Sequence, residues 1–389
     1  MRFLKKLFRK TIPKVITGIF FILFLLSVFV FYGWYEKQFN KVLGLYYVHQ
    51  GDKAYKAHKH ELAIKNYKIG LEKYPEHSLA RCNLGNIYVK YEDYFAASEQ
   101  YDIALQYDPK FIVCRMNSGI VSAEKLADFD KAIREYQTII DTKRVTIHIP
   151  LIFDSVKSTK ENKTIAWYNM GLAYRGKSML IGEKTHASNE YLEKAVEAYR
   201  NALKRKKNSY NINYNYALAN QLLGDYKEAG LGYCRAIELE PMAFDAHYNL
   251  AILLKRIGRL RESQEELEKA LLIVDSHQNP YIAKYVFDVY SQVVEKSTIQ
   301  DGVKSNRAIS PEGLVQDGKH TSHVVTEQVE NEDDPLGVNH ITYVNGKVVT
   351  DSEEADKFMK KSFSKCTAKK VFENYEEERL YNGRYSRDF

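Results

Sequence analysis

Residues 171–178 match the pattern G-x-x-x-x-G-K-[ST], in which backbone amides and a lysine hold the phosphates of a nucleotide. Gly171, Gly176, Lys177 and Ser178 fill its fixed places. The pattern works between a strand and a helix, where successive N–H groups converge on phosphate. Here Gly171 is the eighth residue of a repeat, and Leu172 to Arg175 should be helical. We therefore expect a coincidence and keep a nucleotide-dependent switch only as a remote alternative.

The remaining reactive residue types form no catalytic or metal-binding pattern. The sequence holds no H-E-x-x-H, and His320 and His323 lie in a polar stretch that is weak evidence for a metal. The four cysteines include no C-x-x-C pair. For Cys82 and Cys114 we expect two buried free thiols, with a bridge between them as the alternative. The sequence thus predicts no catalytic residue, no metal and no cofactor, and a protein that is not an enzyme.

A pattern of small, aromatic and proline residues recurs with a period of 34 residues. Gly85, Ala97, Tyr101, Ala104 and Pro109 form one set, and the same internal spacing recurs at Ala217, Ala229, Tyr233, Ala236 and Pro241 and at Gly51, Ala63, Tyr67, Gly70 and Pro75. Extending the pattern gives six units: 44–77, 78–111, 112–163, 164–209, 210–243 and 244–277. Such periodicity predicts stacked helical hairpins that bind other molecules.

This pattern resembles the tetratricopeptide repeat family. The resemblance is clearest in the fourth unit, at Trp167, Met170, Gly171, Tyr174, Ala195, Tyr199 and Ala202. It implies a first helix A, a tight turn and a second helix B in each unit. It further implies a right-handed superhelix whose concave groove is lined by the A helices and binds protein or peptide partners.

The physical basis of such hairpins can be read from the residue types. Small residues at the eighth and twentieth positions of a unit let helices A and B approach closely, while apolar residues at the seventh, eleventh and twenty-fourth fill the space around them. Pro75, Pro109 and Pro241 end the B helices. Pro280 opens a segment that we expect to be a last helix covering unit six, completing an array over 44–297.

The sixth position of units two to six is always asparagine, and in unit one it is His49. Asparagine is a mediocre helix former, so its amides are candidates for hydrogen bonds to the main chain of an extended peptide. The candidate groove residues are Asn83, Asn86, Asn117, Tyr168, Asn169, Arg175, Tyr214, Asn215, Tyr248, Asn249 and Lys255. The alternative is that these asparagines stabilise the neighbouring helix. The family's clamp for an acidic peptide C-terminus is incomplete in this sequence.

Two insertions interrupt the period. Residues 141–163 include a β-branched, apolar run that suits a short strand, a plug over the groove, or a loop on the edge of the array. Residues 175–188 are expected to lengthen the A–B connection of unit four as a basic, polar and mobile segment.

The N-terminal region has the composition of a membrane anchor. Residues 15–35 are 21 residues without a charge, which as a helix would measure about 30 Å, one bilayer core. A cleaved signal peptide has a shorter apolar region, and no small-x-small site follows here. We expect a single transmembrane helix, with residues 36–43 continuing it into the first repeat. The alternatives are a cleaved signal and a lipid-facing helix in a larger assembly.

The flanking charges predict the orientation. The leader, residues 1–14, carries Arg2, Lys5, Lys6, Arg9, Lys10 and Lys14 and no acid. This bias places the N-terminus in the cytoplasm and the array on the exported side, with the bacterial periplasm favoured. The formal net charge of +7 comes mostly from this leader, so we expect no nucleic-acid partner.

The C-terminal region loses the period. Residues 298–340 have the composition of an acidic flexible linker. In residues 341–389, Asn345-Gly346 between two β-branched runs predicts a hairpin, followed by a charged helical stretch. This small element is expected to dock on a partner, with a lid over the groove as the alternative.

These features together predict an all-α repeat superhelix behind a single N-terminal transmembrane helix. The predicted function is a membrane-anchored adaptor that holds protein segments in its groove during assembly of an envelope complex. The main alternative is a structural subunit of a large envelope machine that uses its convex face and insertions. The sequence leaves the partner, the organism and the oligomeric state open.

Overall fold

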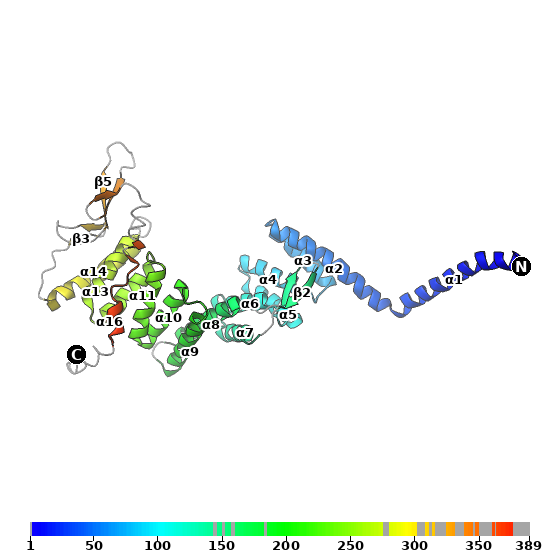
Figure 1. Ribbon diagram of the computed structural model, residues 1–389, viewed down its shortest axis with the longest axis horizontal. Coiled ribbons are helices and arrows are strands. Elements are labelled where there is room, and N and C mark those ends of the chain that lie inside the picture. The colour runs from blue at the N-terminus through cyan, green and yellow to red at the C-terminus, as the bar shows by residue number, and fades with distance from the viewer. Residues whose placement is uncertain are drawn as a thin grey trace. The chain divides into compact units, whose positions relative to one another are not determined.

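A computed structural model describes residues 2–142, 146–149, 152–156, 160–182, 185–274, 280–301, 308–310, 313–315, 324–330, 338–344, 347–349, 360–361 and 363–375. The chain forms two compact units, Met1–Thr159 and Lys160–Phe389. Figure 1 labels the elements of both units in chain order.

The first unit holds three helical hairpins and a strand pair. Its helices are α1 (Arg2–Val30), α2 (Tyr32–Lys56), α3 (His60–Lys73), α4 (Ser78–Lys90), α5 (Tyr94–Tyr107), α6 (Ile112–Glu124) and α7 (Phe129–Asp141). Helices α2 and α3, α4 and α5, and α6 and α7 pack as pairs, matching the first three predicted repeats. The insertion after α7 contains β1 (Thr146–Ile149) and β2 (Ile152–Val156), which pair antiparallel. Of the forms expected for residues 141–163, the structure therefore contains strand.

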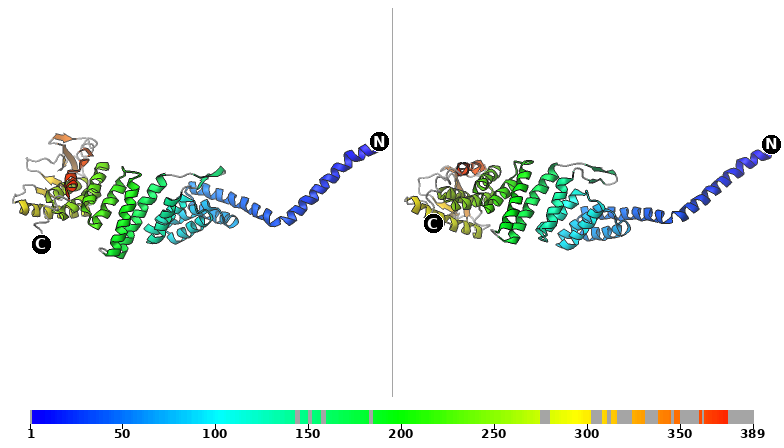
Figure 2. Two further views of the ribbon diagram at one scale, coloured as in Figure 1. Left: turned by 60° about the horizontal axis from the view of Figure 1, so that its bottom comes forward. Right: turned by 90° about the horizontal axis from the view of Figure 1, so that it is seen from below.

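The second unit continues the same architecture. Its helices are α8 (Lys160–Ile181), α9 (His186–Leu203), α10 (Tyr210–Leu223), α11 (Tyr226–Leu239), α12 (Phe244–Arg256), α13 (Leu260–Ile273) and α14 (Pro280–Asp301). In both views of Figure 2 the green helices α8 to α11 stand side by side. Helix α14 packs on α13, with Val286 and Val293 fully buried against the last repeat.

The prediction that residues 175–188 form a mobile connection between the helices of the fourth repeat is wrong. Helix α8 continues to Ile181 and α9 already begins at His186, so most of the insertion lengthens the two helices. The extra turns pack on each other: the hydroxyls of Ser178 and Ser188 lie 2.9 Å apart and are buried. The rings of Tyr174 and Tyr191 stack with centroids 6.3 Å apart. Residues that can pack on their neighbours therefore extend the hairpin.

Close contact between the two helices of a repeat depends on the small residue at the eighth position. A Cβ atom added at Gly85 would lie 2.6 Å from the ring of Tyr101, and one at Gly171 would lie 2.5 Å from the ring of Tyr199. Both distances are too short for any side chain, so the twenty-fourth-position tyrosine lies directly on the glycine backbone. In the fifth repeat Ala217 occupies the eighth position, and the small partner is Gly232 on α11, where an added Cβ would lie 2.9 Å from the Ala217 Cβ.

Strands occur outside the repeats, so the all-α description holds for the array alone. After α14 the described residues contain β3 (Ala308–Ser310), β4 (Gly313–Val315), β5 (Val324–Glu330), β6 (Val338–Val344) and β7 (Lys347–Val349). The expectation of a linker over 298–340 therefore differs from the structure there. Strands β6 and β7 pair antiparallel with Val344 opposite Lys347, the hairpin that Asn345-Gly346 predicts, although these two residues lie outside the described ones.

The N-terminal apolar segment is helical but divided. Helix α1 ends at Val30 and α2 begins at Tyr32, so residues 36–43 are continuous with the first repeat. Among the described residues, no single helix is both long and apolar enough to cross a membrane. Two segments, Val15–Ser27 and Tyr32–Lys56, pass the test together as a pair bent by 79°. The single straight span that the sequence predicts is therefore not supported.

Candidate binding surface

The candidate residues lie on the A-helix face, defined here as the surface of the first helices of successive repeats. These helices are α2, α4 and α6 in the first unit and α8, α10 and α12 in the second. Ten of the eleven candidates are half-buried, and Asn215 is buried. Hydrogen bonds join most of them into small groups that link neighbouring A helices within each unit.

In the first unit, the sixth-position amides bond to the preceding repeat. The Asn117 amide donates to the carbonyl oxygen of Asn86 over 2.8 Å. The Asn83 amide nitrogen lies 3.4 Å from a carboxylate oxygen of Asp52 and 3.4 Å from the hydroxyl of Tyr67. Asn83, Asn86 and Asn117 thus hold neighbouring A helices together, which is the alternative role considered for them.

The ninth-position residues Asp52 and Asn86 accept a second bond, from the tyrosine of their own repeat. The Tyr67 hydroxyl donates to Asp52 and the Tyr101 hydroxyl donates to Asn86, each over 2.7 Å. Burial, reinforced by the Asp52 carboxylate at Tyr67, raises the pKa of both phenols far above the ordinary value of 10.0. The hydroxyls of Tyr67 and Tyr101 therefore each have an acceptor within their own repeat.

The second unit arranges the same positions differently. Asn215 donates to the hydroxyl of Tyr168 over 3.1 Å, and Asn249 donates to the hydroxyl of Tyr214 over 2.7 Å. The Arg175 guanidinium donates to the carbonyl oxygen of Asn215 over 2.7 Å. These bonds link α8 to α10 through Tyr168, Arg175 and Asn215, and α10 to α12 through the pair Tyr214 and Asn249.

Two buried tyrosines of this unit have lost the acceptor that their counterparts use. The ninth position is leucine in both repeats, at Leu172 and Leu218. The hydroxyls of Tyr199 and Tyr233 are buried and find no hydrogen-bond partner among the described residues. Burial raises the pKa of both phenols, while the nearby charge of Arg175 opposes that rise. Two buried hydroxyls beneath this part of the surface are therefore unpaired among the described residues.

Aromatic pairs border the network. Tyr210 stacks on Tyr214 with ring centroids 5.6 Å apart, and Phe244 stacks on Tyr248 at 5.7 Å. Tyr285 on α14 lies 6.1 Å from Tyr248. The sequence analysis did not include Tyr210, Phe244 and Tyr285 in the site. Tyr210 and Phe244 could have been predicted, because each lies four residues before a candidate tyrosine and so on the same helix face.

The last predicted residues are peripheral. Lys255 is half-buried and donates from Nζ to Gln292 on α14 over 3.1 Å, which places it at the edge formed by the covering helix. Asn169 is half-buried on α8.

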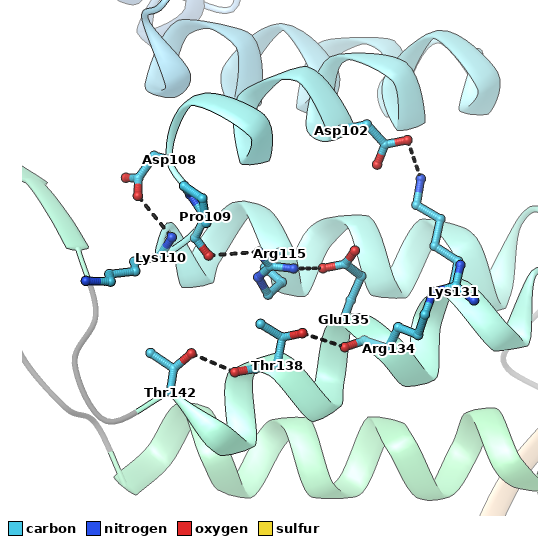
Figure 3. Close-up of polar contacts among 10 residues, drawn as sticks. All are labelled: Asp102, Asp108, Pro109, Lys110, Arg115, Lys131, Arg134, Glu135, Thr138 and Thr142. Carbon is cyan, nitrogen blue, oxygen red and sulfur yellow. Dashed lines mark hydrogen bonds and ion pairs between the residues drawn. The ribbon is translucent and has the colours of Figure 1, made fainter.

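A donor at the fourth position closes the turn between successive repeats. Arg81, Arg115 and His247 donate to the carbonyls of Pro75, Pro109 and Pro241, over 2.8, 2.8 and 2.9 Å respectively. Figure 3 shows Arg115 between Pro109 and Glu135, with which it also forms an ion pair. These contacts stabilise the array and lie apart from the candidate surface.

In the last repeat this turn contains a buried ion pair. His247 and Glu266 are 0% exposed, and Nδ1 of His247 lies 2.6 Å from a Glu266 carboxylate oxygen. Nε2 of His247 faces the Pro241 carbonyl, which only accepts, so the ring lies between two hydrogen-bond acceptors. Burial raises the pKa of Glu266, but the hydrogen bond from His247 and the charge of Lys269 outweigh it and the pKa is lowered.

The phosphate-loop match lies within helix α8. Gly171 packs under Tyr199, Lys177 Nζ lies 4.7 Å from the centroid of the Tyr191 ring, and the Ser178 hydroxyl is buried against Ser188. Helical N–H groups point along the axis to their own carbonyls and do not converge on a ligand. The nucleotide-dependent switch therefore has no structural basis at these residues. No group of three or more His, Cys, Asp or Glu side chains in the described residues could hold a metal ion.

The C-terminal segment docks on its own array. Cys366 forms a disulfide with Cys234 of α11, across 132 residues of sequence, whereas Cys82 and Cys114 are buried free thiols, as expected for that pair. Phe372, on α16 (Lys369–Glu373), is fully buried over Gly230, where an added Cβ would lie 2.3 Å from the Phe372 ring. This contact is with a B helix, so the segment is not a lid over the A-helix face.

Two stretches of this helical-hairpin array match known repeat models. Models described as tetratricopeptide repeat match residues 186–238 and 244–273. The chain therefore contains tetratricopeptide repeats, as its sequence pattern predicts.

Similar proteins share this architecture. The TPR repeat-containing protein MJ1428 of Methanocaldococcus jannaschii is 27% identical over 226 residues, which span 57% of this chain and 37% of that protein. The crystal structure of MamA has a TM-score of 0.41 at 20% identity, covering 51% of this chain and 91% of that one. PilF of Pseudomonas aeruginosa has a TM-score of 0.43 at 15% identity, covering 69% and 99%. These likenesses concern the repeat architecture alone.

Proposed function

We propose that this protein is a non-enzymatic adaptor whose A-helix face in the second unit binds an extended segment of a partner protein. The observation that carries the proposal is the pair of unpaired buried hydroxyls of Tyr199 and Tyr233 near the charge of Arg175. A buried donor without an acceptor costs roughly 1–3 kcal/mol, so a ligand that supplies acceptors is stabilised there. Peptide carbonyls and acidic side chains are such acceptors.

The contacts assign different roles to the candidate residues. Tyr168, Arg175, Tyr214 and Tyr248 are the proposed contact residues, with Asn169, Asn215, Asn249 and Lys255 beside them. Tyrosine and arginine dominate binding energy at protein interfaces because they bury large areas with few rotatable bonds. Asn83, Asn86 and Asn117 are occupied by contacts within the first unit, so we place the ligand on the second unit.

The proposal includes membrane attachment through residues 15–35, with the N-terminus in the cytoplasm and the array exported, in a bacterium to the periplasm. The side chains of Phe20, Phe24 and Phe29 are 68, 56 and 84% exposed, which suits a lipid environment. The Cys234–Cys366 disulfide supports an oxidising compartment, because such bonds persist there and are rare in the cytosol. Anchoring raises the local concentration of the adaptor for partners in assembling envelope complexes.

Crosslinked affinity purification from native membranes tests the proposal. We expect a partner that co-purifies with the wild type to be lost from a variant carrying Arg175→Ala, Tyr214→Ala and Tyr248→Ala. Truncating one good aromatic anchor costs about 2 kcal/mol or more of binding free energy. The matched control is Tyr91→Ala, which removes a tyrosine that is 52% exposed in the first unit.

A structural subunit that binds through its B helices and its strand insertion is the competing function. The close docking of residues 363–375 on α11 favours it, because that contact shows a B-helix surface shaped for a peptide segment. It predicts stoichiometric partners that the triple variant retains. Retention of every partner by a folded triple variant would contradict the adaptor proposal.

A further inference from the structure

The outer side of the first helix of the array is uncovered. In later repeats the third-position residue is buried: Ala80, Cys114 and Ala246 are 0% exposed and Ile212 is 4% exposed. In the first repeat this position is Tyr46, which is 57% exposed. The reason is that no helical hairpin of the described residues lies on that side of α2.

Tyr46 is the last member of an apolar stripe along α2. Tyr35, Phe39, Val42 and Tyr46 follow at spacings of four, three and four residues, which places them on one helix face. They are 39, 68, 66 and 57% exposed. The ends of a repeat array need a covering helix or a polar outer surface. Helix α14 covers the other end of the array, so this stripe requires an occupant.

Cationic side chains lie on the side of α2 opposite the stripe. A cavity of about 480 Å³ is bordered by Lys37 and Lys41 of α2, by Lys73 of α3, and by Tyr74 and Glu76 of the turn after α3. Lys41 Nζ lies 5.0 Å from the centroid of the Tyr74 ring, and Lys37 Nζ lies 3.5 Å from Glu76. An apolar, aromatic face opposite a lysine-bearing face is typical of helices that lie in a membrane interface.

We propose that this stripe is a membrane-binding surface that lays α2 along the bilayer, with Lys37 and Lys41 on the opposite side of the helix, which faces water. The inference rests on the membrane attachment in the proposed function. The segments Val15–Ser27 and Tyr32–Lys56 meet at 79°, so when the first crosses the bilayer the second runs nearly parallel to its surface. The stripe itself is about 16 Å long, too short to cross a core of about 30 Å.

Two features favour lipid over a second copy of the chain or another membrane helix. The stripe continues the exposed apolar side chains of α1 without a polar interruption on that face, from Val30 through Phe31 to Tyr35. Its aromatic members also suit the headgroup level, where their amphipathic rings are favoured. The first repeat would then rest on the membrane and direct the rest of its unit away from it.

The test uses the full-length protein in vesicles of phosphatidylcholine and phosphatidylglycerol. A Val42→Cys variant is labelled with an environment-sensitive fluorophore, and lipid-borne nitroxides serve as quenchers. The matched control is Leu62→Cys, an apolar residue of α3 that is 47% exposed. Labelling is selective because Cys82 and Cys114 are buried and the other two cysteines are bonded.

We expect emission from position 42 to shift to the blue and to be quenched roughly twofold or more beyond that from position 62.

Three outcomes would overturn the inference. If the protein floats with vesicles but the two labels behave alike, the surface is wrong and the anchor stands. If the protein does not float, the anchor is wrong and the surface falls with it. If unlabelled Val42→Cys forms chain-to-chain disulfides in vesicles, a second copy covers the stripe.

Discussion

The two units use one repeat pattern with opposite polar outcomes. In the first, Tyr67 and Tyr101 donate to the acceptors Asp52 and Asn86, which sixth-position asparagines also contact. In the second, leucine replaces that acceptor and the hydroxyls of Tyr199 and Tyr233 are unpaired among the described residues. Identical repeat positions can therefore stabilise an array in one place and leave capacity for a ligand in another.

The side-chain contacts of the fourth-position residue also differ between the two units. Arg81 meets the neutral Gln100 over 3.3 Å, and Arg115 meets Glu135 at a site where both side chains retain some exposure. His247 and Glu266 are completely buried. The second unit thus depends on a desolvated ion pair, whereas the first tolerates an amide at the same place.

The largest expected effect is that of Glu266→Gln. It removes the buried carboxylate that both His247 and Lys269 contact, so we expect the free energy of unfolding to fall by about 3–5 kcal/mol. Glu135→Gln is the matched change in the first unit. We expect it to cost about 1 kcal/mol or less, because the equivalent arginine of the preceding repeat, Arg81, already bonds to a neutral glutamine, Gln100. Denaturant unfolding followed by circular dichroism measures both, and equal losses would refute the contrast.

The same pair predicts a pH dependence confined to the second unit. The pKa of Glu266 is lowered in the folded state from its ordinary value of 4.5. Its contribution to stability is therefore complete above that value and is lost as the pH falls through the lowered folded pKa. We expect acid unfolding of the wild type to become less pronounced in Glu266→Gln. Hydrogen exchange resolved by peptide would locate the loss in α12 and α13.

Reduction should destabilise the second unit and spare the first. The Cys234–Cys366 bond closes a 132-residue separation, so Cys366→Ser should cost about 2–4 kcal/mol. Cys82 and Cys114 are free in the first unit, so a reducing agent should leave α2 to α7 unchanged. Limited proteolysis at residues 363–375 with and without reductant measures this. Equal cleavage under both conditions would show that Phe372 alone holds the segment.

The smallest effect tests the central contrast most directly. Tyr67→Phe removes a hydrogen bond to Asp52 and should cost about 1 kcal/mol of stability. Tyr199→Phe removes a hydroxyl that has no partner in the described residues, so we expect no loss or a slight gain. Thermal unfolding of the two variants compares them. A larger loss for Tyr199→Phe would mean that its hydroxyl is already satisfied.

Local sequence determined the repeats. Glycine or alanine at the eighth position and tyrosine at the twenty-fourth specify a close helical hairpin wherever they occur together, because only a small residue fits beneath the ring. For this reason the packing of helices into hairpins, and the antiparallel pairing of β6 with β7, followed from spacing. The candidate residues Tyr168, Arg175 and Tyr214 were chosen by position alone, and their role in binding stays a prediction.

Tertiary structure decided which of these positions are already occupied. Spacing cannot show that Asn86 serves both Tyr101 and Asn117, or that Cys366 lies next to Cys234, because such contacts join residues 15 to 132 apart in the chain. It also cannot show that the insertion after Arg175 continues as helix, since packing against α9 stabilises those turns. Sequence set the repeating unit, and the contacts between units of the repeat determined where polar groups were left for a ligand.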